Sequence, residues 1–340
     1  MMGAFTVIKF IGNHSARFAC AAVSLFGLLA GPASAQDPYP SRPIQLVVPF
    51  SAGGDADVSA RNLAAAAAGF IGQPLVVLNK PGANGVIGSD FVKNAAPDGY
   101  TLLLGRIGSQ VLLPVLQPKT TDYSWKDFTF LGLLELNPVI CVVDPDSKYK
   151  TLKDLAAELK KHPGKLTYSH SGLATVQNLA PQLLFSSLGL KSNAAVNIPY
   201  KGGNEVALAV LSKEVDFACN NLSSMAGLVK SGKLRALVTT TPERLPEFPN
   251  IPTARELGFP GLEAVIGWSA LYGPPKMDPV AVKKWAAVLK HVSQDPKWIA
   301  GNANFGGIPH VLSPADTEKY VGRSYAIYSG LVAKAGLRMR

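Results

Sequence analysis

Residues 44–68 read IQLVVPFSAGGDADVSARNLAAAAA, and this stretch decides the fold. The apolar, β-branched run from Ile44 to Val48 predicts a buried strand, and the loop Pro49–Gly54 ends it. Helix-forming residues follow from Ala56 to Ala68, so a glycine loop lies where a helix begins. Backbone N–H groups lack partners at such a point and the helix dipole is positive, so the loop can hold a carboxylate or phosphate.

The same unit then repeats along the chain. A second strand, Leu75–Leu78, runs into the glycine-rich loop Asn79–Gly88, and a third strand spans Thr101–Leu104. Later helices are expected at Leu152–Lys161, Val176–Leu188, Gly203–Leu211 and Ser223–Val229, and strands at Leu166–Ser169, Ala194–Ile198, Val215–Cys219 and Leu234–Thr239. This alternation predicts α/β layers built on parallel sheets.

Two long extended runs, Phe130–Val143 and Leu262–Tyr272, separate these series of units. We interpret them as two crossings of the chain between two α/β lobes. The closing segments Pro279–Asp295 and Ser313–Ala335 are expected to be helices. Glycine loops at the carboxyl ends of strands would then face a cleft between the lobes, which is where open α/β sheets bind ligands.

These residues resemble the substrate-binding proteins of the tripartite tricarboxylate transporters, often called the Bug family. The resemblance is carried, in fixed order, by Tyr39–Ile44, Val48–Phe50, Gly53-Gly54, Asp57, Gly72–Pro74, Pro81–Ala83, Ala95–Leu102, Pro163–Tyr168, Pro199–Gly203, Val215–Phe217, Asn221-Leu222, Ser231–Leu237 and Pro249–Gly258. It implies a type II periplasmic binding protein fold with two crossover strands. On that plan residues 36–137 and 260–340 form lobe 1, and residues 138–259 form lobe 2.

Residues 1–35 are predicted to be a signal peptide. Lys9 and Arg17 precede or begin an apolar region from Phe18 to Ala30, and Ala33-Ser34-Ala35 fits a cleavage site. The apolar region is shorter than the ~20 residues needed to span a bilayer. We therefore expect a soluble periplasmic protein that begins at Gln36.

Charge and cysteine content exclude some functional classes. The formal charge falls from +10 to +8 after cleavage, since the leader carries two cations and no acid. The remaining basic residues are scattered among Asp and Glu, which argues against nucleic-acid binding. Cys141 and Cys219 could pair after export, but a chain of this size buries enough core to be stable without a disulfide. We favour two buried thiols.

No catalytic or cofactor motif is recognisable. A Gly-x-Ser-x-Gly nucleophile elbow and a Walker lysine are missing, and the histidines are not spaced as metal ligands. We expect a non-enzymatic protein without metal or cofactor.

The expected ligand site combines both lobes. Backbone N–H groups of the Ser51–Asp55 loop would hold one carboxylate, although glycines there could also serve only a tight turn. Thr175 matches a hydroxyl position of the family that contacts the far end of the ligand, although a helix N-cap is an alternative role. The predicted ligand-binding residues are Phe50, Ser51, Ala52, Gly53, Gly54, Asp55, Gly108, Ser109, Ser169, Gly172, Ala174, Thr175, Tyr200, Asn220 and Trp268. Packing is the alternative for Phe50, Tyr200 and Trp268.

Asn220 bears on the ligand class. The resemblance implies an Asp at this position in many members, where it can pair with a ligand ammonium. Asn carries no such charge, so we expect a plain carboxylate, keto acid or aromatic acid rather than an amino acid. Asp57, by contrast, is expected to support the first helix turn, because a carboxylate would repel an anion.

The resemblance implies a periplasmic receptor that closes around a small organic carboxylate and delivers it to the permease subunits of a tripartite tricarboxylate transporter. We expect a monomer. An alternative is a sensor whose closed form docks on a two-component kinase ectodomain, and a less favoured one is an exported α/β enzyme.

Overall fold

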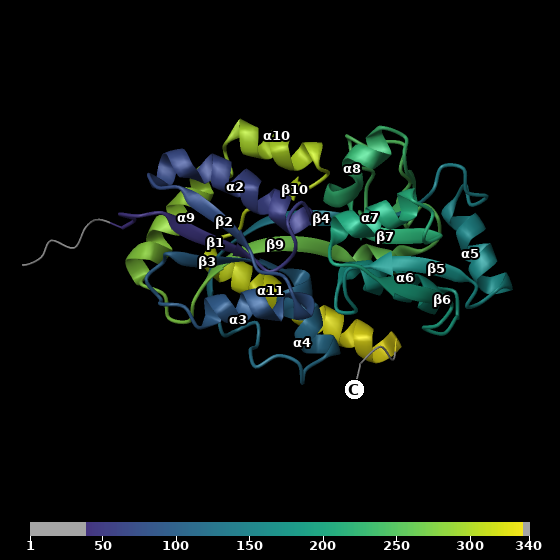
Figure 1. Ribbon diagram of the computed structural model, residues 1–340, viewed down its shortest axis with the longest axis horizontal. Helices are drawn as coiled ribbons and strands as arrows, with labels where there is room; N and C mark the ends of the chain where they lie inside the picture. The colour runs from purple at the N-terminus through teal and green to yellow at the C-terminus, as the bar shows by residue number, and fades with distance from the viewer. Residues whose placement is uncertain (1–38, 336–340) are drawn as a thin grey trace, which may run out of the picture. The chain divides into compact units, whose positions relative to one another are not determined.

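The computed structural model describes residues 39–335, so the predicted signal peptide lies outside the described residues. Two sheets share one long strand, β4 (Thr129–Val143), as Figure 1 shows. Residues Thr129–Pro138 of β4 pair with the first sheet, and Val139–Val143 pair with the second. The extended run predicted from Phe130 to Val143 is confirmed as a strand that carries the chain from one lobe to the other.

The first lobe is built on a sheet with the order β2-β1-β3-β9-β4, in which β1 is parallel to both β2 and β3. Its strands are β1 (Ile44–Val48), β2 (Leu75–Asn79), β3 (Thr101–Arg106), β9 (Ile266–Gly273), β10 (Ile308–Pro309) and the first part of β4. Its helices and helical turns are α2 (Asp55–Ile71), η1 (Ala83–Gly85), α3 (Val86–Lys93), η2 (Gly108–Leu112), α4 (Leu113–Leu116), α9 (Pro279–Val292), α10 (Pro296–Asn304) and α11 (Pro314–Ala335).

The second lobe is built on the second part of β4 and on a parallel set of strands in the order β7-β5-β6. Its strands are β5 (Leu166–His170), β6 (Ala195–Pro199), β7 (Phe217–Asn221) and β8 (Arg235–Thr239), and its helices are α5 (Leu152–Lys161), α6 (Val176–Ser187), α7 (Gly203–Leu211) and α8 (Leu222–Lys230). Most of these elements begin within two residues of the predicted positions, because short apolar runs between turn residues mark them clearly.

The return to the first lobe differs from prediction at its start. Leu262 to Ala264 lie in a 3-10 turn, η3 (Pro260–Ala264), and the strand begins only at Ile266. The strand β9 then pairs with β3 on one side and β4 on the other, so it closes the first sheet. The helix α10 and the short strand β10 were not predicted, since Pro296 to Pro309 lacks a clear apolar period.

Apolar side chains bury both faces of the sheets. In Figure 1, α2, α9 and α10 lie over one face of the first sheet, and α3, α4 and α11 lie over the other. One core cluster joins Leu103 of β3, Val139 of β4, Tyr168 of β5 and Trp268 of β9, so it runs from one lobe into the other. Trp268 is completely buried in this cluster. The core is therefore continuous across the strands that connect the two lobes.

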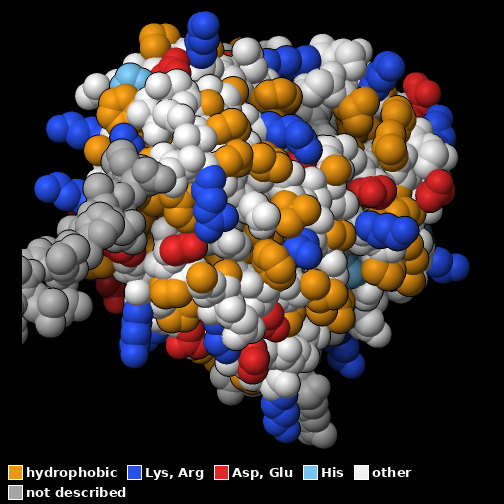
Figure 2. Space-filling model, turned by 60° about the vertical axis from the view of Figure 1, so that its left-hand side comes forward, with side chains coloured by type: hydrophobic (Ala, Val, Ile, Leu, Met, Phe, Trp, Pro, Cys, Tyr) orange, Lys and Arg blue, Asp and Glu red, His pale blue; other side chains and the backbone are white. Residues whose placement is uncertain are grey.

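Surface charge is mixed. On the face that Figure 2 shows, Lys and Arg side chains are interspersed with Asp, Glu and apolar side chains rather than gathered into a stripe. Within residues 39–335, none of the helices is both long and apolar enough to cross a bilayer. The same part of the chain holds no group of three or more His, Cys, Asp or Glu side chains that could bind a metal ion.

Cys141 and Cys219 form a disulfide, and our interpretation of them as free thiols was wrong. The antiparallel register of β4 and β7 places Cys141 directly opposite Cys219, on the same face of the sheet. Both residues are buried. Whether a cross-link forms depends on the strand register, which brings the two side chains together, and not on whether the chain needs the added stability.

Removing this disulfide should destabilise the second lobe without changing its fold. The bond closes a loop with a sequence separation of 78 residues. Chain-entropy arguments give about 4.5 kcal/mol for a loop of this length, as an upper figure. Urea unfolding of a Cys141→Ala/Cys219→Ala variant, compared with the oxidised wild type, should show a lower midpoint. Two titratable thiols in the unfolded, unreduced wild type would contradict the assignment.

Candidate functional site

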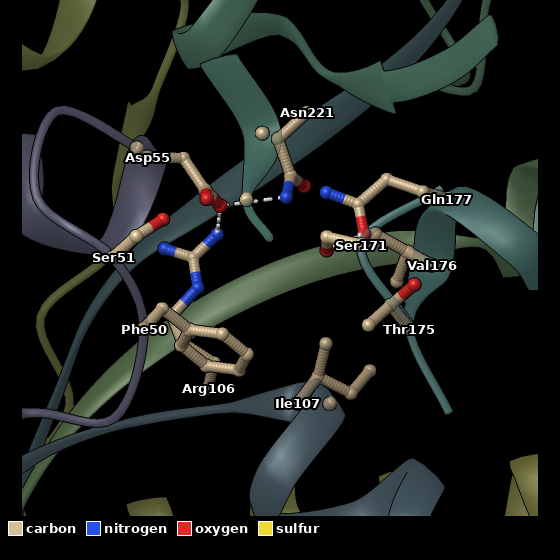
Figure 3. Close-up of a pocket in the computed structure, with 14 residues that line it drawn as sticks. Phe50, Ser51, Asp55, Arg106, Ile107, Ser171, Thr175, Val176, Gln177 and Asn221 are labelled. Atoms are coloured by element: carbon tan, nitrogen blue, oxygen red, sulfur yellow. Dashed lines mark hydrogen bonds and ion pairs between the residues drawn. The ribbon is translucent and has the colours of Figure 1, made fainter. Parts of the chain in front are cut away.

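A cavity lies between the two lobes at the carboxyl ends of their parallel strands. It encloses about 440 Å³ of space, part of which opens to solvent. Its lining residues come from both lobes (Figure 3): Phe50, Ser51, Gly54, Asp55, Arg106, Ile107, Gly108, Ser171, Thr175, Val176, Gln177, Gly202, Gly203 and Asn221. The expected position of a ligand site in an open α/β fold therefore coincides with this cavity.

Helices of both lobes begin at the cavity without a side-chain cap. The residues that precede the first turns of α2, α6, α7 and α8 are Gly54, Thr175, Gly202 and Asn221, and the side chain of none of them accepts a hydrogen bond from its own helix. All four residues line the cavity. Among the described residues, no N-cap side chain bonds the first-turn N–H groups of these helices, and the positive ends of their dipoles meet at one place, an arrangement that favours a bound anion.

Among the helices that begin elsewhere, α5, α9 and α10 are capped by side chains, whereas α3 and α4 are not. Thr151 and Asp154 form a reciprocal capping box at α5. The carboxylates of Asp278 and Asp295 cap α9 and α10 by accepting hydrogen bonds from Val280 N–H and Lys297 N–H, each at 2.7 Å. The chain can therefore cap helices with side chains, yet four uncapped helix ends meet at this one cavity.

Within the first loop, one of the expected donors is already used. Gly53 N–H donates to Asp57 Oδ2 at 2.9 Å, and Arg61 pairs with the same carboxylate at 2.9 Å. Burial acts to raise the pKa of Asp57, but the hydrogen bonds from Arg61 and Gly53 outweigh it and hold that pKa below its usual value. Asp57 thus supports the first turn of α2, as expected, and leaves Ser51, Gly54 and Asp55 at the cavity.

An ion pair that sequence reasoning missed lies at the centre of the cavity wall. Arg106, at the end of β3, donates from Nη2 to the carboxylate of Asp55 and from Nη1 to Ser269 Oγ at 2.6 Å. The side chains of Arg106 and Asp55 are only 5% and 12% exposed. The available signal was a single cation inside the apolar run from Leu102 to Ile107, which is hard to bury without a partner.

The same carboxylate also joins the two lobes. Asn221, at the end of β7, donates from Nδ2 to Asp55 Oδ2 at 2.6 Å. Figure 3 shows the Asp55 side chain reaching both the Arg106 guanidinium and the Asn221 amide, with Gln177 and Thr175 on the opposite side of the cavity. Asp55 is therefore a side-chain link across the cleft in addition to its place in the first loop.

A second buried carboxylate lies behind Arg106. Glu135 on β4 is 1% exposed, and its Oε1 accepts hydrogen bonds from the hydroxyls of Ser59 and Ser269. Because Ser269 also accepts from Arg106, the guanidinium is linked to both carboxylates. The positive charge of Arg106 is thus opposed by more than one negative charge, so it is not a free cation for an incoming anion.

In the second lobe, the loop after β5 is held by its own polar groups. Thr175 Oγ1 donates to Gly172 O at 2.7 Å, and Gly172 N–H donates to His170 Nδ1 at 2.9 Å. Burial lowers the pKa of His170, which keeps Nδ1 available as an acceptor. Gly172 has φ 146°, and a Cβ there would fall 1.8 Å from Asn84 Oδ1 of the other lobe, so only glycine allows this approach.

Asn220 lies behind the cavity wall. It is fully buried, its Nδ2 donates to Gly203 O, and its Oδ1 accepts from Gln177 Nε2, each at 2.8 Å. It therefore orients two lining residues, Gly203 and Gln177, rather than facing a ligand. From Asn220 we expected a site without a carboxylate. The cavity nevertheless contains one, that of Asp55.

The other predicted residues divide into two groups. Six of the fifteen line the cavity: Phe50, Ser51, Gly54, Asp55, Gly108 and Thr175. Tyr200 lines an adjoining hollow that shares Phe50, Ser51 and Ser171 with the cavity. The predicted residues that line neither space are Ala52, Gly53, Ser109, Ser169, Gly172, Ala174, Asn220 and Trp268. Ser109 and Ser169, for example, are buried and donate to backbone oxygens of Arg106 and Val206.

Comparisons with known proteins agree with this geometry. Residues 59–337 match the tripartite tricarboxylate transporter family receptor. The chain belongs to this receptor family. The predicted resemblance is confirmed, and with it the two-lobed periplasmic binding protein fold. Over 314 residues the receptor is 32% identical to Protein BugT of Bordetella pertussis, an alignment that covers 92% of this chain and 94% of BugT.

Solved structures of the same kind are similar over most of this receptor. The periplasmic binding protein BugD superposes with a TM-score of 0.82 at 32% identity, covering 89% of this chain and 100% of BugD. MatC from Rhodopseudomonas palustris, solved with bound malate, superposes with a TM-score of 0.81 at 29% identity. That match covers 86% of this chain and 100% of MatC.

The uncapped end of α2 gives a sharp test. Gly54 has φ −77°, which proline can adopt, so Gly54→Pro should remove one N–H donor while keeping the loop. A hydrogen bond to a charged group contributes about 1.5–3 kcal/mol, so we expect ligand affinity to fall about 10-fold or more. Isothermal titration calorimetry measures the change.

Gly54→Ala is the matched control, since it adds a Cβ but keeps the N–H. The added atom would lie 3.5 Å from Ser51 O, an ordinary contact. Both variants should unfold cooperatively. If the proline variant binds as tightly as the alanine variant, the end of α2 does not hold the anion.

Proposed function

We propose that this protein is a periplasmic receptor that binds a small organic carboxylate in the cavity between its lobes and delivers it to a membrane permease. The observation that carries the proposal is the set of uncapped helix ends, α2 from one lobe and α6, α7 and α8 from the other, around one cavity. A carboxylate supplies the acceptors that these N–H groups lack.

Membership of the receptor family narrows the anion to a carboxylate. MatC, which shares the fold and 29% identity, was solved with malate, a small dicarboxylate. The lining here adds apolar walls from Phe50, Ile107 and Val176 between the polar groups. A short carbon chain with a carboxylate at one or both ends suits such a lining.

Closure of the two lobes is the proposed mechanism. Ligand contacts to α2 and to the helices of the second lobe exist together only when the cleft is closed, so the ligand shifts the population toward that state. Contacts across the cleft accompany closure: Asn221 donates to Asp55, and the Ser51 hydroxyl lies 3.5 Å from Lys201 O. The closed form is then the one that the permease subunits would recognise.

Delivery to a permease, a monomeric state and the lack of any covalent chemistry are parts of this proposal. Membership of a family of transporter receptors supports delivery to a permease and a binding rather than a catalytic role, and the monomeric state stays a prediction. The sensor and enzyme alternatives gain no support from that membership.

Native mass spectrometry of the freshly purified protein, followed by thermal unfolding with added ligands, tests the proposal. We expect a retained carboxylic acid, and a rise in the unfolding midpoint with small acids but not with their neutral amides. A ligand at 100 times its Kd stabilises the folded state by about 2.7 kcal/mol, which is readily measured.

The ligand panel should contain mono- and dicarboxylic acids, both unsubstituted and carrying hydroxyl or amino groups. Stabilisation by no carboxylic acid, equal stabilisation by the amides, or chemical conversion of the bound acid would each contradict the proposal.

A further inference from the structure

Asp55 places a negative charge in the cavity where the proposed carboxylate ligand, itself an anion, binds. Asp55 is the first residue of α2, and it lines the cavity. Its Oδ2 accepts both the Arg106 and the Asn221 hydrogen bonds. Its other oxygen, Oδ1, accepts no hydrogen bond from any described residue. One lone-pair-bearing oxygen at the cavity is therefore left for a donor.

No free cation lines the cavity itself among the described residues, and Lys201 lines only the adjoining hollow. Among the described residues that line the cavity, Arg106 is the one cation, and it is bonded to Asp55 and, through Ser269, to buried Glu135. A ligand carboxylate at the end of α2 would have the Asp55 carboxylate beside it with nothing to separate the two charges. Like charges that are partly removed from water repel strongly.

Asn221, on the same wall, carries a second acceptor, but this oxygen is buried against Gly267 of β9 rather than open to the cavity. Asn221 lines the cavity and is 4% exposed, and its Oδ1 has no partner among the described residues. The hydrogen bond from its Nδ2 to Asp55 fixes which way the amide points, so this oxygen cannot become a donor by a flip. The acceptor that this wall offers to a ligand is therefore Asp55 Oδ1, whereas the helix ends offer N–H donors.

We infer that Asp55 determines specificity, by selecting carboxylic acids that carry a hydroxyl or ammonium donor next to the carboxylate. This inference rests on the proposed function and names the ligand class of the same cavity. Because Asp55 is itself the first residue of α2, its side chain and the N–H groups of that helix end are only a few bonds apart. The ligand donor and carboxylate must be equally close, as in a 2-hydroxy or 2-amino acid.

Opposite this wall, the polar side chains are already bonded to one another. Ser171 Oγ donates to Gln177 Oε1 at 2.7 Å, and Gln177 Nε2 donates to Asn220. Thr175 donates to the backbone of Gly172. Because these side chains already have hydrogen-bond partners in the protein, they have less need of a donor from the ligand. Asp55 is then the group that distinguishes substituted from unsubstituted acids.

Matched acids that differ at one carbon test the inference. Calorimetry on the wild type would compare succinate with malate and aspartate, glutarate with 2-hydroxyglutarate and glutamate, and propionate with lactate and alanine. For the chain length that binds best, we expect the dissociation constant of the substituted acid to be lower than that of its unsubstituted partner by a factor of about 10 or more. The hydroxyl and ammonium arms show which donor the site takes.

Asp55→Asn is the decisive variant, since the amide can still accept from Arg106 while placing an NH2 group where Oδ1 was. It should abolish the preference for substituted acids, with unsubstituted acids binding as well as in the wild type or better. Asp278→Asn is the control, because it makes the same change at the start of α9, away from the cavity, and should keep the preference. Asp55→Ser repeats the test if the amide variant fails to fold.

The outcomes separate the two proposals. If no acid binds the wild type, the carboxylate receptor function fails and this inference fails with it. If unsubstituted acids bind as tightly as their partners, or if both Asp55 variants keep the preference, the receptor function stands and the role of Asp55 is overturned.

Discussion

Unpaired backbone N–H groups at the starts of α2, α6, α7 and α8 are the constraint on which the rest of the site depends. A buried donor without an acceptor costs about 1–3 kcal/mol, so a closed cavity surrounded by such helix ends is unfavourable when it is dry and empty. An anion removes that cost for both lobes at once, because α2 belongs to one lobe and the other helices to the second. Binding and closure are thereby coupled without any covalent step.

The side chains around these helix ends refine the site rather than create it. Arg106 is held by Asp55 and Ser269, so in the proposed site the anion is bound mainly by backbone dipoles, which need no reorganisation when the ligand arrives. Asp55 is linked to Asn221 across the cleft, and we propose that it is also an acceptor beside the anion site. A receptor built like this discriminates by the pattern of donors and acceptors on the ligand rather than by its net charge.

Local sequence patterns predicted most of the fold, and long-range pairing explains most of what they missed. The helix α5 and the helix α7 were predicted at their observed bounds, since apolar periods and turn residues define them. The strand β7 ends two residues later than expected, at Asn221. Neighbouring strand residues face opposite sides, so the sequence could not decide whether Asn220 or Asn221 faces the cavity. Arg106 with Asp55, and Cys141 with Cys219, are partners only because sheet order and register bring them together.

A crystal structure of the protein with its retained ligand tests the central claim most directly. The distance to measure joins the ligand carboxylate oxygens to the backbone nitrogens of the first turn of α2 and of the second-lobe helices. The account predicts about 2.7–3.2 Å to α2 and to at least one helix of the second lobe. A carboxylate bound only by side-chain cations such as Lys201, with water at the helix ends, would contradict it.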